Sequence, residues 1–327
     1  MMRLETAIEH WELVEPFATA RDCITHVPVI VVRLTAMDGQ HGRGEAAGVD
    51  YDGETPQTMT EQLQTVQSQL HAGVTGEELA SLLPAGGARN ALDCALWDLR
   101  ARQSGVPVWR AAGLPRPRPV TTAFTIGLGD VTDVRRKAEA ARGLPRLKLK
   151  ADAERHVDLV RVVREVQPHV PLLVDANQSW TRGLLERLMP PLRDLGVELI
   201  EQPLARGLDG ELDGLAPVVP LAADESCTDR ASLAALRGRY QFANVKLDKC
   251  GGLTEAFALC HEAERLGFGL MVGNMCGTSL AMAPAFLIAQ RCRHVDLDGP
   301  LLQRRDRPHA IHYEAGRMHP PSPELWG

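Results

Sequence analysis

Long apolar stretches and concentrated positive charge are both missing from this 327-residue sequence. No apolar run comes near the ~18–20 residues that a membrane-spanning helix needs, and no signal-peptide apolar core follows Met1. The net charge is −6 and no block of lysines or arginines stands out, which argues against nucleic acid as a partner. We therefore expect a soluble, cytoplasmic protein that binds neither membrane nor nucleic acid.

Cysteine pairs, phosphate-binding loops and zinc motifs are missing as well. The seven cysteines are scattered, odd in number and without a CxxC pair, which favours free buried thiols in a reducing compartment over disulfides. The Gly-rich stretch 42–55 has neither G-x-G-x-x-G nor Walker spacing. None of the 11 histidines lies in HExxH or another zinc spacing, and His309 with His312 is too weak a pair to indicate a metal site.

The residues that are present are organised around the short stretch 146–152, with the sequence RLKLKAD. Strand side chains alternate with period two, so Lys148 and Lys150 share one face while Leu147 and Leu149 take the other. An edge strand could expose both lysines to water. On a buried face, two ammonium groups are costly unless carboxylates, a metal ion or a substrate lie beside them.

The chain after this stretch repeats one pattern of residues at regular intervals. Short apolar runs end at Asp175, Glu201, Asp224 and Lys246, and the steps between these positions, counted from Lys150, are 25, 26, 23 and 22 residues. Each step matches the length of one strand, one helix and two short loops. A series of such units with polar residues at the strand ends is typical of a (β/α) barrel, whose active site lies at that end.

The polar residues at these strand ends predict a metal site with two bases. Crowded carboxylates repel one another, and Mg²⁺ is the cation that commonly binds such a set of oxygen ligands. A single aspartate at a strand end could instead cap the next helix. Lys150 and Lys246 would face each other across the ion, and like charge from Lys148 and the metal would lower the pKa of the lysine base. A substrate carboxylate on the ion would make its α-carbon easier to deprotonate. Two bases on opposite faces of that carbon permit racemisation or epimerisation.

The motifs around these residues resemble those of the enolase superfamily, muconate-lactonising subgroup. They are K-L-K (148–150), V-D-A-N (174–177), E-Q-P-L (201–204), A-D-E-S (223–226) and V-K-L-D-K-C-G-G-L (245–253). Within the subgroup the chain most resembles the dipeptide epimerases, in particular the L-Ala-D/L-Glu epimerases of murein peptide recycling. Two further stretches, 83–99 and V-D-L-D-G-P (295–300), carry this narrower resemblance, which covers nearly the whole chain.

The resemblance implies one Mg²⁺ per subunit and a dipeptide substrate. It implies that L-Ala-L-Glu and L-Ala-D-Glu are interconverted by 1,1-proton transfer through an enediolate. The metal ligands implied are Asp175, Glu201 and Asp224, and the catalytic acid and base are Lys150 and Lys246. The substrate-binding residues implied are Lys148, Arg21, Asp296 and Asp298. Arg21 would bind the glutamyl side-chain carboxylate, and the two aspartates would bind the terminal ammonium. Asn177 and Glu225 are implied as supporting polar residues, with Glu225 beside Lys246.

The fold that follows is a modified (β/α)₇β barrel with an N-terminal α+β capping domain. We expect the capping domain to span 1–117, completed by 301–327, and the barrel to span 118–300. The cap is predicted to have a strand at 28–34, loops over the barrel mouth at 16–22 and 42–55, and helices at 57–71, 75–83 and 88–103. The barrel is expected to begin with a strand at 120–125, and its loop 273–279 has no expected role in catalysis.

Two alternatives remain open. The same site could run a cycloisomerisation or a dehydration to o-succinylbenzoate, with one lysine as the base and the other acting electrostatically, although an ammonium-binding D-x-D pair has no purpose there. A catalytically silent barrel that only binds a ligand would share the fold. The preferred dipeptide is left undetermined, and self-association into a homo-oligomer is compatible with the resemblance.

Overall fold

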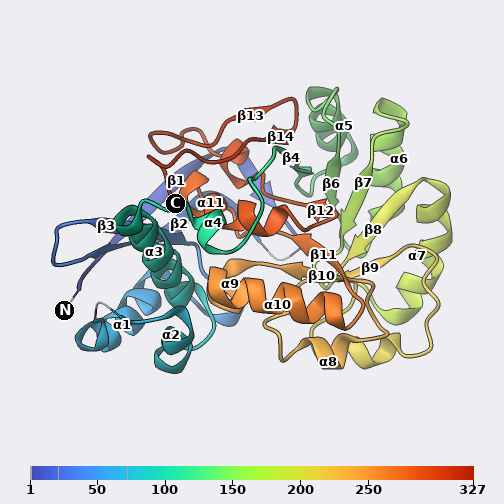
Figure 1. The fold of residues 1–327 in the computed structure, drawn as a ribbon. Coiled ribbons are helices and arrows are strands. Elements are labelled where there is room, and N and C mark those ends of the chain that lie inside the picture. The colour runs from blue at the N-terminus through green and yellow to red at the C-terminus, as the bar shows by residue number, and fades with distance from the viewer. Residues whose placement is uncertain (1, 21, 72) are drawn as a thin grey trace.

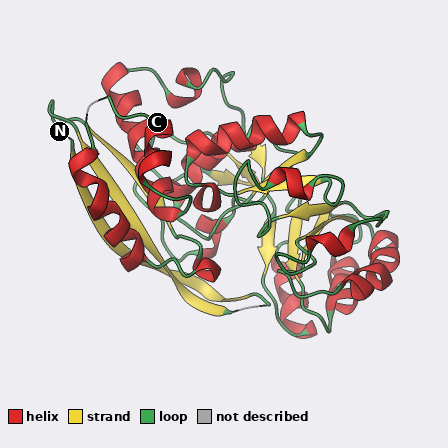
Figure 2. Ribbon diagram, turned by 90° about the horizontal axis from the view of Figure 1, so that it is seen from below, coloured by secondary structure: helices red, strands yellow, loops and turns green. Residues whose placement is uncertain are grey.

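The computed structural model describes residues 2–20, 22–71 and 73–327, which form a cap beside a barrel (Figure 1). In the cap, an antiparallel sheet has the order β1-β2-β3. Its strands are β1 Arg3–Ala18, β2 Cys23–Thr35 and β3 His41–Ala46, and its helices are α1 Pro56–Val66, α2 Gly76–Leu82 and α3 Gly87–Ser104. Figure 2 shows these helices against the long strands. The three predicted helices are confirmed, and the short α4, Val108–Ala111, follows them.

The predicted loop over 42–55 is wrong in its first part, because β3 occupies this stretch and pairs with β2. A Cβ on Gly42 would lie 2.1 Å from the carbonyl oxygen of Ala95, and a Cβ on Gly44 would lie 2.0 Å from that of Ala91. Both alanines belong to α3. The glycines therefore permit a close approach between a strand and a helix, and do not mark a flexible loop.

The first two strands form a longer hairpin than predicted. Residues 16–18, expected in a loop, belong to β1, and Ala18 pairs with Cys23 of β2. The register shifts between Glu12 and Phe17, an irregularity that bends a strand locally. The bent hairpin reaches the barrel, where the backbone N–H of Leu128 donates to the carbonyl oxygen of Ala18 at 2.7 Å.

Eight parallel strands, β5 to β12, form the barrel sheet with neighbours in sequence order. The strands are β5 Phe124–Ile126, β6 Leu147–Lys150, β7 Leu172–Asp175, β8 Val197–Glu201, β9 Leu221–Ala223, β10 Phe242–Val245, β11 Gly269–Val272 and β12 His294–Val295. The helices around them are α5 Val131–Ala140, α6 His156–Val166, α7 Arg182–Asp194, α8 Leu233–Leu236, α9 Leu247–Cys250, α10 Leu253–Arg265 and α11 Ser279–Ala289. This order confirms the predicted repeat of strand and helix.

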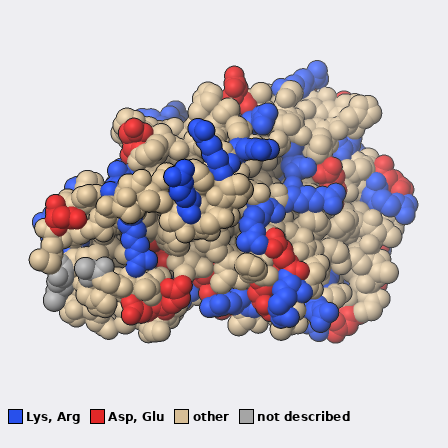
Figure 3. Space-filling model, viewed as in Figure 1, with Lys and Arg blue, Asp and Glu red and all other residues tan. Residues whose placement is uncertain are grey.

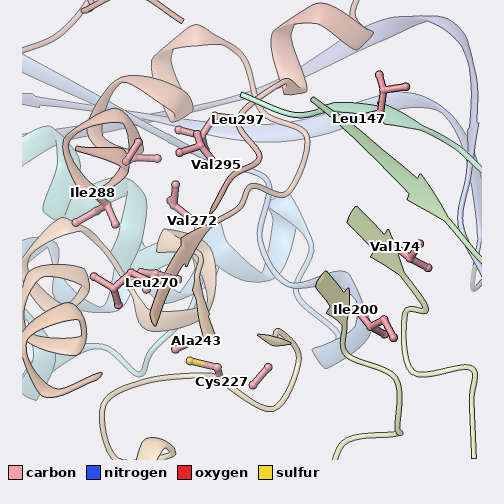
Figure 4. Close-up of a cluster of buried hydrophobic side chains, with 14 of the residues drawn as sticks. Leu147, Val174, Ile200, Cys227, Ala243, Leu270, Val272, Ile288, Val295 and Leu297 are labelled. Carbon is pink, nitrogen blue, oxygen red and sulfur yellow. The ribbon is translucent and has the colours of Figure 1, made fainter. Parts of the chain in front are cut away.

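Side-chain alternation divides each barrel strand between two apolar layers. Residues on the outer face, such as Leu147, Val174 and Ile200, pack in the large core between strands and helices (Figure 4). Residues on the inner face form a separate small cluster that fills the barrel below the strand ends, made of Ala123, Leu173, Leu199, Ala222, Phe242 and Met271. Polar residues that follow on the same inner face are thereby directed to the barrel mouth.

The barrel begins later than predicted. Residues 120–121 form β4, Val120–Thr121, which pairs with β14, Arg317–Met318, and β14 pairs with β13, Tyr313–Glu314. The first barrel strand is β5 alone, and the N–H of Ala123 just before it donates to the carbonyl oxygen of Val295 at 2.8 Å. This bond brings the first and last barrel strands together.

A buried polar cluster joins the cap to the barrel. Glu45 of β3 accepts a hydrogen bond from the backbone N–H of Thr278 at 2.7 Å and lies 2.6 Å from Arg307 Nη2. Arg307 also lies 2.7 Å from Glu9 of β1. Burial raises the pKa of Glu45, and the Arg307 guanidinium opposes that rise. At the C-terminal end, Trp326 Nε1 donates to the carbonyl oxygen of Cys94 in α3 at 3.0 Å.

All seven cysteines are free thiols, as predicted. Four are buried, whereas Cys23 is exposed at the hairpin. Within the described residues, no helix has both the length and the apolar character needed to cross a membrane. Side chains of both charge signs are scattered over the face drawn in Figure 3.

Candidate active site

The carboxyl ends of the barrel strands bring the predicted lysines and carboxylates together. Lys150 pairs in register with Asp175, and Asp175 pairs with Glu201. Asp224 directly follows β9 and Lys246 directly follows β10. Since β6 lies between β5 and β7, an edge strand with exposed lysines is ruled out, and Lys150 and Lys246 are only 8% and 7% exposed.

The two lysines of the K-L-K motif both contact Asp175. Lys150 Nζ donates to Asp175 Oδ2 at 2.7 Å. Lys148, 1% exposed, places its Nζ 3.0 Å from Asp175, 2.8 Å from Glu201 Oε2 and 2.8 Å from Asp296 Oδ2. The Lys148 ammonium thus lies between carboxylates from β7, from β8 and from the end of β12.

Asp224 is held from the other side of the site. Lys246 Nζ donates to its Oδ2 at 2.8 Å, and Lys249 Nζ donates to its Oδ1 at 2.6 Å. Lys249 also donates to the carbonyl oxygen of Asn244 at 3.1 Å. Met275, in a loop expected to have no catalytic role, places its sulfur 3.9 Å from Lys246 Nζ. Lys150 and Lys246 therefore approach the carboxylates from different strands, with β7, β8 and β9 between them.

These contacts shift the pKa values in the site. Burial, reinforced by the neighbouring carboxylate of Asp175, raises the pKa of Glu201 to about 8. Burial disfavours the charge on Lys246, but the contact with Asp224 outweighs it and raises the pKa of this lysine. The pKa of Lys246 is raised because its ammonium touches a carboxylate. The pKa of Lys148 is raised for the same reason.

The carboxylates of Asp175, Glu201 and Asp224 share this region without meeting at a single point. Their oxygens do not all lie within 4.8 Å of one another, and ammonium groups lie between them. The three carboxylates nevertheless interact electrostatically, since the charges of Asp175 and Asp224 both raise the pKa of Glu201. The cluster is thus a set of buried oxygen ligands with like charge at the mouth of the barrel.

The D-x-D pair at the end of β12 faces the same site. Asp296 accepts from Thr125 Oγ1 at 3.2 Å, and Asp298 accepts from the backbone N–H of Thr125 at 2.6 Å. Burial, followed by the charge of Asp296, raises the pKa of Asp298 to about 7. Both side chains are nearly inaccessible to solvent, at 5% and 2%. Two buried carboxylates side by side form a suitable place for a cationic group.

Two residues in left-handed backbone conformation support the carboxylates. Asn177 has φ 41° and its N–H donates to Asp175 Oδ1 at 2.9 Å, while its Nδ2 donates to Glu225 Oε1 at 3.4 Å. Gln202 has φ 33°, and its Oε1 accepts from the N–H of Asp224 at 2.8 Å. Such backbone conformations are costly for residues other than glycine and are held by surrounding contacts. The strand-end loops are therefore fixed by side chains directed back onto the backbone.

Three residues that bond to Glu201 or Asp224 were not predicted from the sequence. They are Lys249, Gln202 and Asn244, whose Nδ2 donates to Glu201 Oε1 at 2.9 Å. For Lys249 a signal was available, because a residue three positions after Lys246 in a helical turn lies on the same side. The predicted substrate residue Arg21 lies outside the described residues.

Two family descriptions match this chain. "Mandelate racemase / muconate lactonizing enzyme, N-terminal domain" matches residues 1–113 and "Enolase C-terminal domain-like" matches residues 133–324. The L-Ala-D/L-Glu epimerase of Escherichia coli (strain K12) is 40% identical over 313 residues, covering 95% of this chain and 97% of that protein. An N-acetyl-D-glutamate racemase of a Pseudoalteromonas species is 44% identical over 252 residues, covering 76% of this chain and 79% of the other.

Solved structures agree with these relatives. A crystal structure of an enolase family member from Agrobacterium tumefaciens, with bound sodium and L-Ala-L-Glu, has a TM-score of 0.96 and 39% identity, and each chain is covered completely. A dipeptide epimerase from Methylococcus capsulatus, complexed with Mg and L-Arg-D-Lys, has a TM-score of 0.88 and 30% identity, covering 99% of this chain and 98% of that chain. The capping domain and barrel architecture is thus shared along the whole chain.

Proposed function

Because the chain belongs to the mandelate racemase and muconate lactonizing enzyme family of the enolase superfamily, we propose that it is a Mg²⁺-dependent isomerase that epimerises dipeptides. The reaction is inversion of the α-carbon of the C-terminal residue, from L-Ala-L-Glu to L-Ala-D-Glu. The observation that carries the proposal is the placement of Lys150 and Lys246, two buried amines on opposite sides of one carboxylate cluster.

The residues present fit a divalent cation. Asp175, Glu201 and Asp224 supply only oxygen donors, which is the donor set that hard cations such as Mg²⁺ take. The pKa of Glu201, raised to about 8 by burial and by its neighbours, reflects negative charge that a divalent cation would balance. Bound Mg²⁺ would stabilise the negative charge that develops on the substrate carboxylate when the α-proton leaves.

The two lysines are assigned the proton transfers. One lysine, as the neutral amine, takes the proton from the α-carbon, and the other, as the ammonium, returns a proton to the opposite face. Inversion results because the two amines come from β6 and from the end of β10, with the carboxylate cluster between them. Lys148, held by carboxylates, supplies positive charge near the substrate carboxylate. Lys249 holds Asp224 in place.

The substrate termini are assigned to the remaining charged residues. Asp296 and Asp298 would bind the terminal ammonium of the dipeptide, since both carboxylates are buried at the barrel mouth and both lie against Thr125. Arg21 is assigned to the glutamyl side-chain carboxylate, and Asn177 with Glu225 supports the site. This assignment separates the chain from cycloisomerases and o-succinylbenzoate synthases, whose substrates have no ammonium group.

The proposal extends to domain roles and to the cellular setting. The capping domain, 1–117 with 301–327, would close over the mouth of the barrel, 118–300. The contact between Leu128 and Ala18 supports this arrangement. The proton transfers are reversible, and the D-glutamyl epimer is of the kind released from murein, so it would enter as the substrate, and we place the reaction in murein peptide recycling in the cytoplasm. A homo-oligomer is compatible with this setting.

One relative points to a second candidate substrate. The N-acetyl-D-glutamate racemase is 44% identical to this chain, and racemisation of an N-acylated glutamate needs the same proton transfers. N-acetylglutamate has no ammonium group for Asp296 and Asp298. The buried D-x-D pair therefore favours the dipeptide, and a direct comparison of both substrates decides between them.

Deuterium uptake from D₂O tests the proposed function. The purified protein is incubated with L-Ala-L-Glu, with other L,L-dipeptides and with N-acetyl-L-glutamate, and incorporation at the α-carbon is followed by mass spectrometry. We expect uptake into L-Ala-L-Glu with Mg²⁺ and none after EDTA treatment. Uptake only into N-acetylglutamate would transfer the assignment to that racemase reaction. If a Mg²⁺-binding preparation exchanges no substrate, the epimerase proposal is refuted.

Replacing either lysine tests the two-base assignment. Lys150→Ala or Lys246→Ala should lower the epimerisation rate by about 10²–10⁴-fold, the usual effect of losing a general acid or base. Each variant should still exchange the α-proton of one epimer without inverting it, because one base remains on one face. The partly exposed Lys137 provides the control Lys137→Ala, and circular dichroism confirms folding. Epimerisation within about tenfold of the parent rate would contradict the assignment.

A further inference from the structure

The C-terminal hairpin brings together three side chains of the types that bind metals. The ligand atoms of His312, Glu314 and His319 all lie within 4.8 Å of one another. Glu314 Oε2 is 4.0 Å from His312 Nε2 and 3.8 Å from His319 Nε2. The two imidazole rings have their centroids 5.0 Å apart. This group, here called the hairpin cluster, belongs neither to the carboxylate cluster nor to the D-x-D pair.

The backbone of the hairpin sets this arrangement. Tyr313 pairs with Met318 across β13 and β14, and the N–H of His319 donates to the carbonyl oxygen of His312 at 2.9 Å. The two histidines are therefore opposite each other, and Glu314 lies two residues after His312, on the same side of the strand. The turn uses positive φ at Ala315 and Gly316, 48° and 74°. Such a tight turn fixes the register of the pair.

The hairpin is anchored to the barrel. β14 pairs with β4, and the N–H of Thr122 donates to the carbonyl oxygen of Gly316 at 3.0 Å. Tyr313, between His312 and Glu314, points the other way and donates to the carbonyl oxygen of Leu297 at 2.8 Å. Figure 1 shows β13 and β14 beside β4, away from the cap helices α1 and α2. The ligand side chains thus project from a supported backbone.

The surroundings leave the cluster available to a ligand. Glu314 is 72% exposed, His312 is 68% exposed and His319 is 33% exposed. Arg317, which is opposite Glu314 in register, instead directs its guanidinium to the carbonyl oxygen of Pro119 at 3.5 Å. A metal ion could therefore reach all three side chains directly from solvent.

We propose that the hairpin cluster binds one divalent transition-metal ion of the Zn²⁺ class. Two imidazole nitrogens and one carboxylate oxygen form the donor set that Zn²⁺ takes in open tetrahedral sites, with water in the fourth position. Bonds of about 2.1 Å in such a shell place the ligand atoms about 3.4 Å apart, so the Glu314 oxygen needs to move closer to the two imidazole nitrogens by about 0.4–0.6 Å. Imidazole suits Zn²⁺ and its neighbours better than Mg²⁺, which distinguishes this site from the carboxylate cluster.

The test measures Zn²⁺ binding while the barrel site is saturated. Full-length protein in excess Mg²⁺ is titrated with Zn²⁺ by calorimetry, and the metal content is determined after gel filtration. We expect one saturable Zn²⁺ site per chain, weakened at least about tenfold in His312→Ala and in His319→Ala, since each removes one of three protein ligands. The affinity should also fall on acidification, because imidazole must be neutral to bind a metal.

A matched control is available in the same segment. His309→Asn removes a histidine outside the cluster, and asparagine tolerates the positive φ of 59° found there. This variant should bind Zn²⁺ like the parent protein. Unchanged Mg²⁺-dependent epimerase activity and melting temperature in all three variants establish that each remains folded. Equal Zn²⁺ stoichiometry and affinity in the parent and in the double variant H312A/H319A would overturn the proposal.

Discussion

Acid stability should depend strongly on one histidine at the closed end of the barrel. His294 of β12 is 2% exposed, its ring packs edge-to-face on Phe242 with centroids 4.9 Å apart, and its Nδ1 has no hydrogen-bond partner. Burial, with smaller contributions from Arg146 and Arg293, lowers its pKa from 6.5 to about 4. The folded protein therefore holds the neutral imidazole, whereas the unfolded chain protonates it at an ordinary pKa.

The sign and size of the effect follow from linkage. A depressed folded-state pKa contributes stability that is present above pH 6.5 and is lost as the pH falls toward about 4. A difference of about 2.5 pKa units corresponds to about 3 kcal/mol when the loss is complete. At pH 5, where the unfolded imidazole is largely protonated and the folded one is not, the loss amounts to about 2 kcal/mol.

His294→Gln isolates this contribution, because glutamine has a polar side chain that does not titrate. Its buried amide carries a cost of its own, but that cost does not vary with pH. Urea unfolding of both proteins at pH 7.5 and pH 5.0 gives the free energy of unfolding at each pH. We expect the parent to lose about 2 kcal/mol more than the variant between these values. Losses that agree within about 0.5 kcal/mol would refute the buried neutral histidine.

Three further substitutions test packing and charge elsewhere. Gly44→Ala should destabilise the cap by at least about 1–3 kcal/mol, because its Cβ would overlap α3. The control Gly183→Ala should not, because its Cβ would make only an ordinary contact with Arg187 at 3.7 Å; equal melting temperatures of the two variants would contradict this. Lys249→Met should weaken Mg²⁺ binding by freeing Asp224, with rescue by Lys249→Arg, and an unchanged Mg²⁺ affinity would show that Lys249 does not position this ligand. Arg307→Leu should lower the free energy of unfolding by about 3–5 kcal/mol, because it leaves Glu45 buried without its cation. Adding Glu45→Gln to this variant should recover part of that loss. Strictly additive effects of the two substitutions on stability would argue against the ion pair.

Several features of the site could be predicted because they depend on local period and chain length. The alternation of 146–152 placed Lys148 and Lys150 on one face, and the structure puts both toward the interior. The regular steps between strand ends predicted that Asp175 and Glu201 lie next to each other, and they are partners in register. The three cap helices also follow from their apolar periodicity. Each of these inferences needs only the geometry of a strand or a helix.

Other features depend on residues that meet only after folding. Gly42 and Gly44 indicated a loop, since nothing local shows that α3 packs against this strand. The pKa of Lys246 is raised because Asp224 touches its ammonium group. The spacing of residues along the sequence does not show this contact. In the sequence, His309 with His312 was too weak a pair to indicate a metal site, whereas the folded hairpin places His312 opposite His319.

The family, the barrel repeat and the set of charged residues directed to the barrel mouth could thus be inferred from local sequence patterns. Which ammonium group lies on which carboxylate, where close packing requires glycine, and how Glu45 of the cap reaches Arg307 near the C-terminus became clear only in the folded protein. The two kinds of information differ in their range. Periodicity acts over a few residues along the chain, whereas desolvation, ion pairing and steric contact act between atoms a few ångströms apart in space.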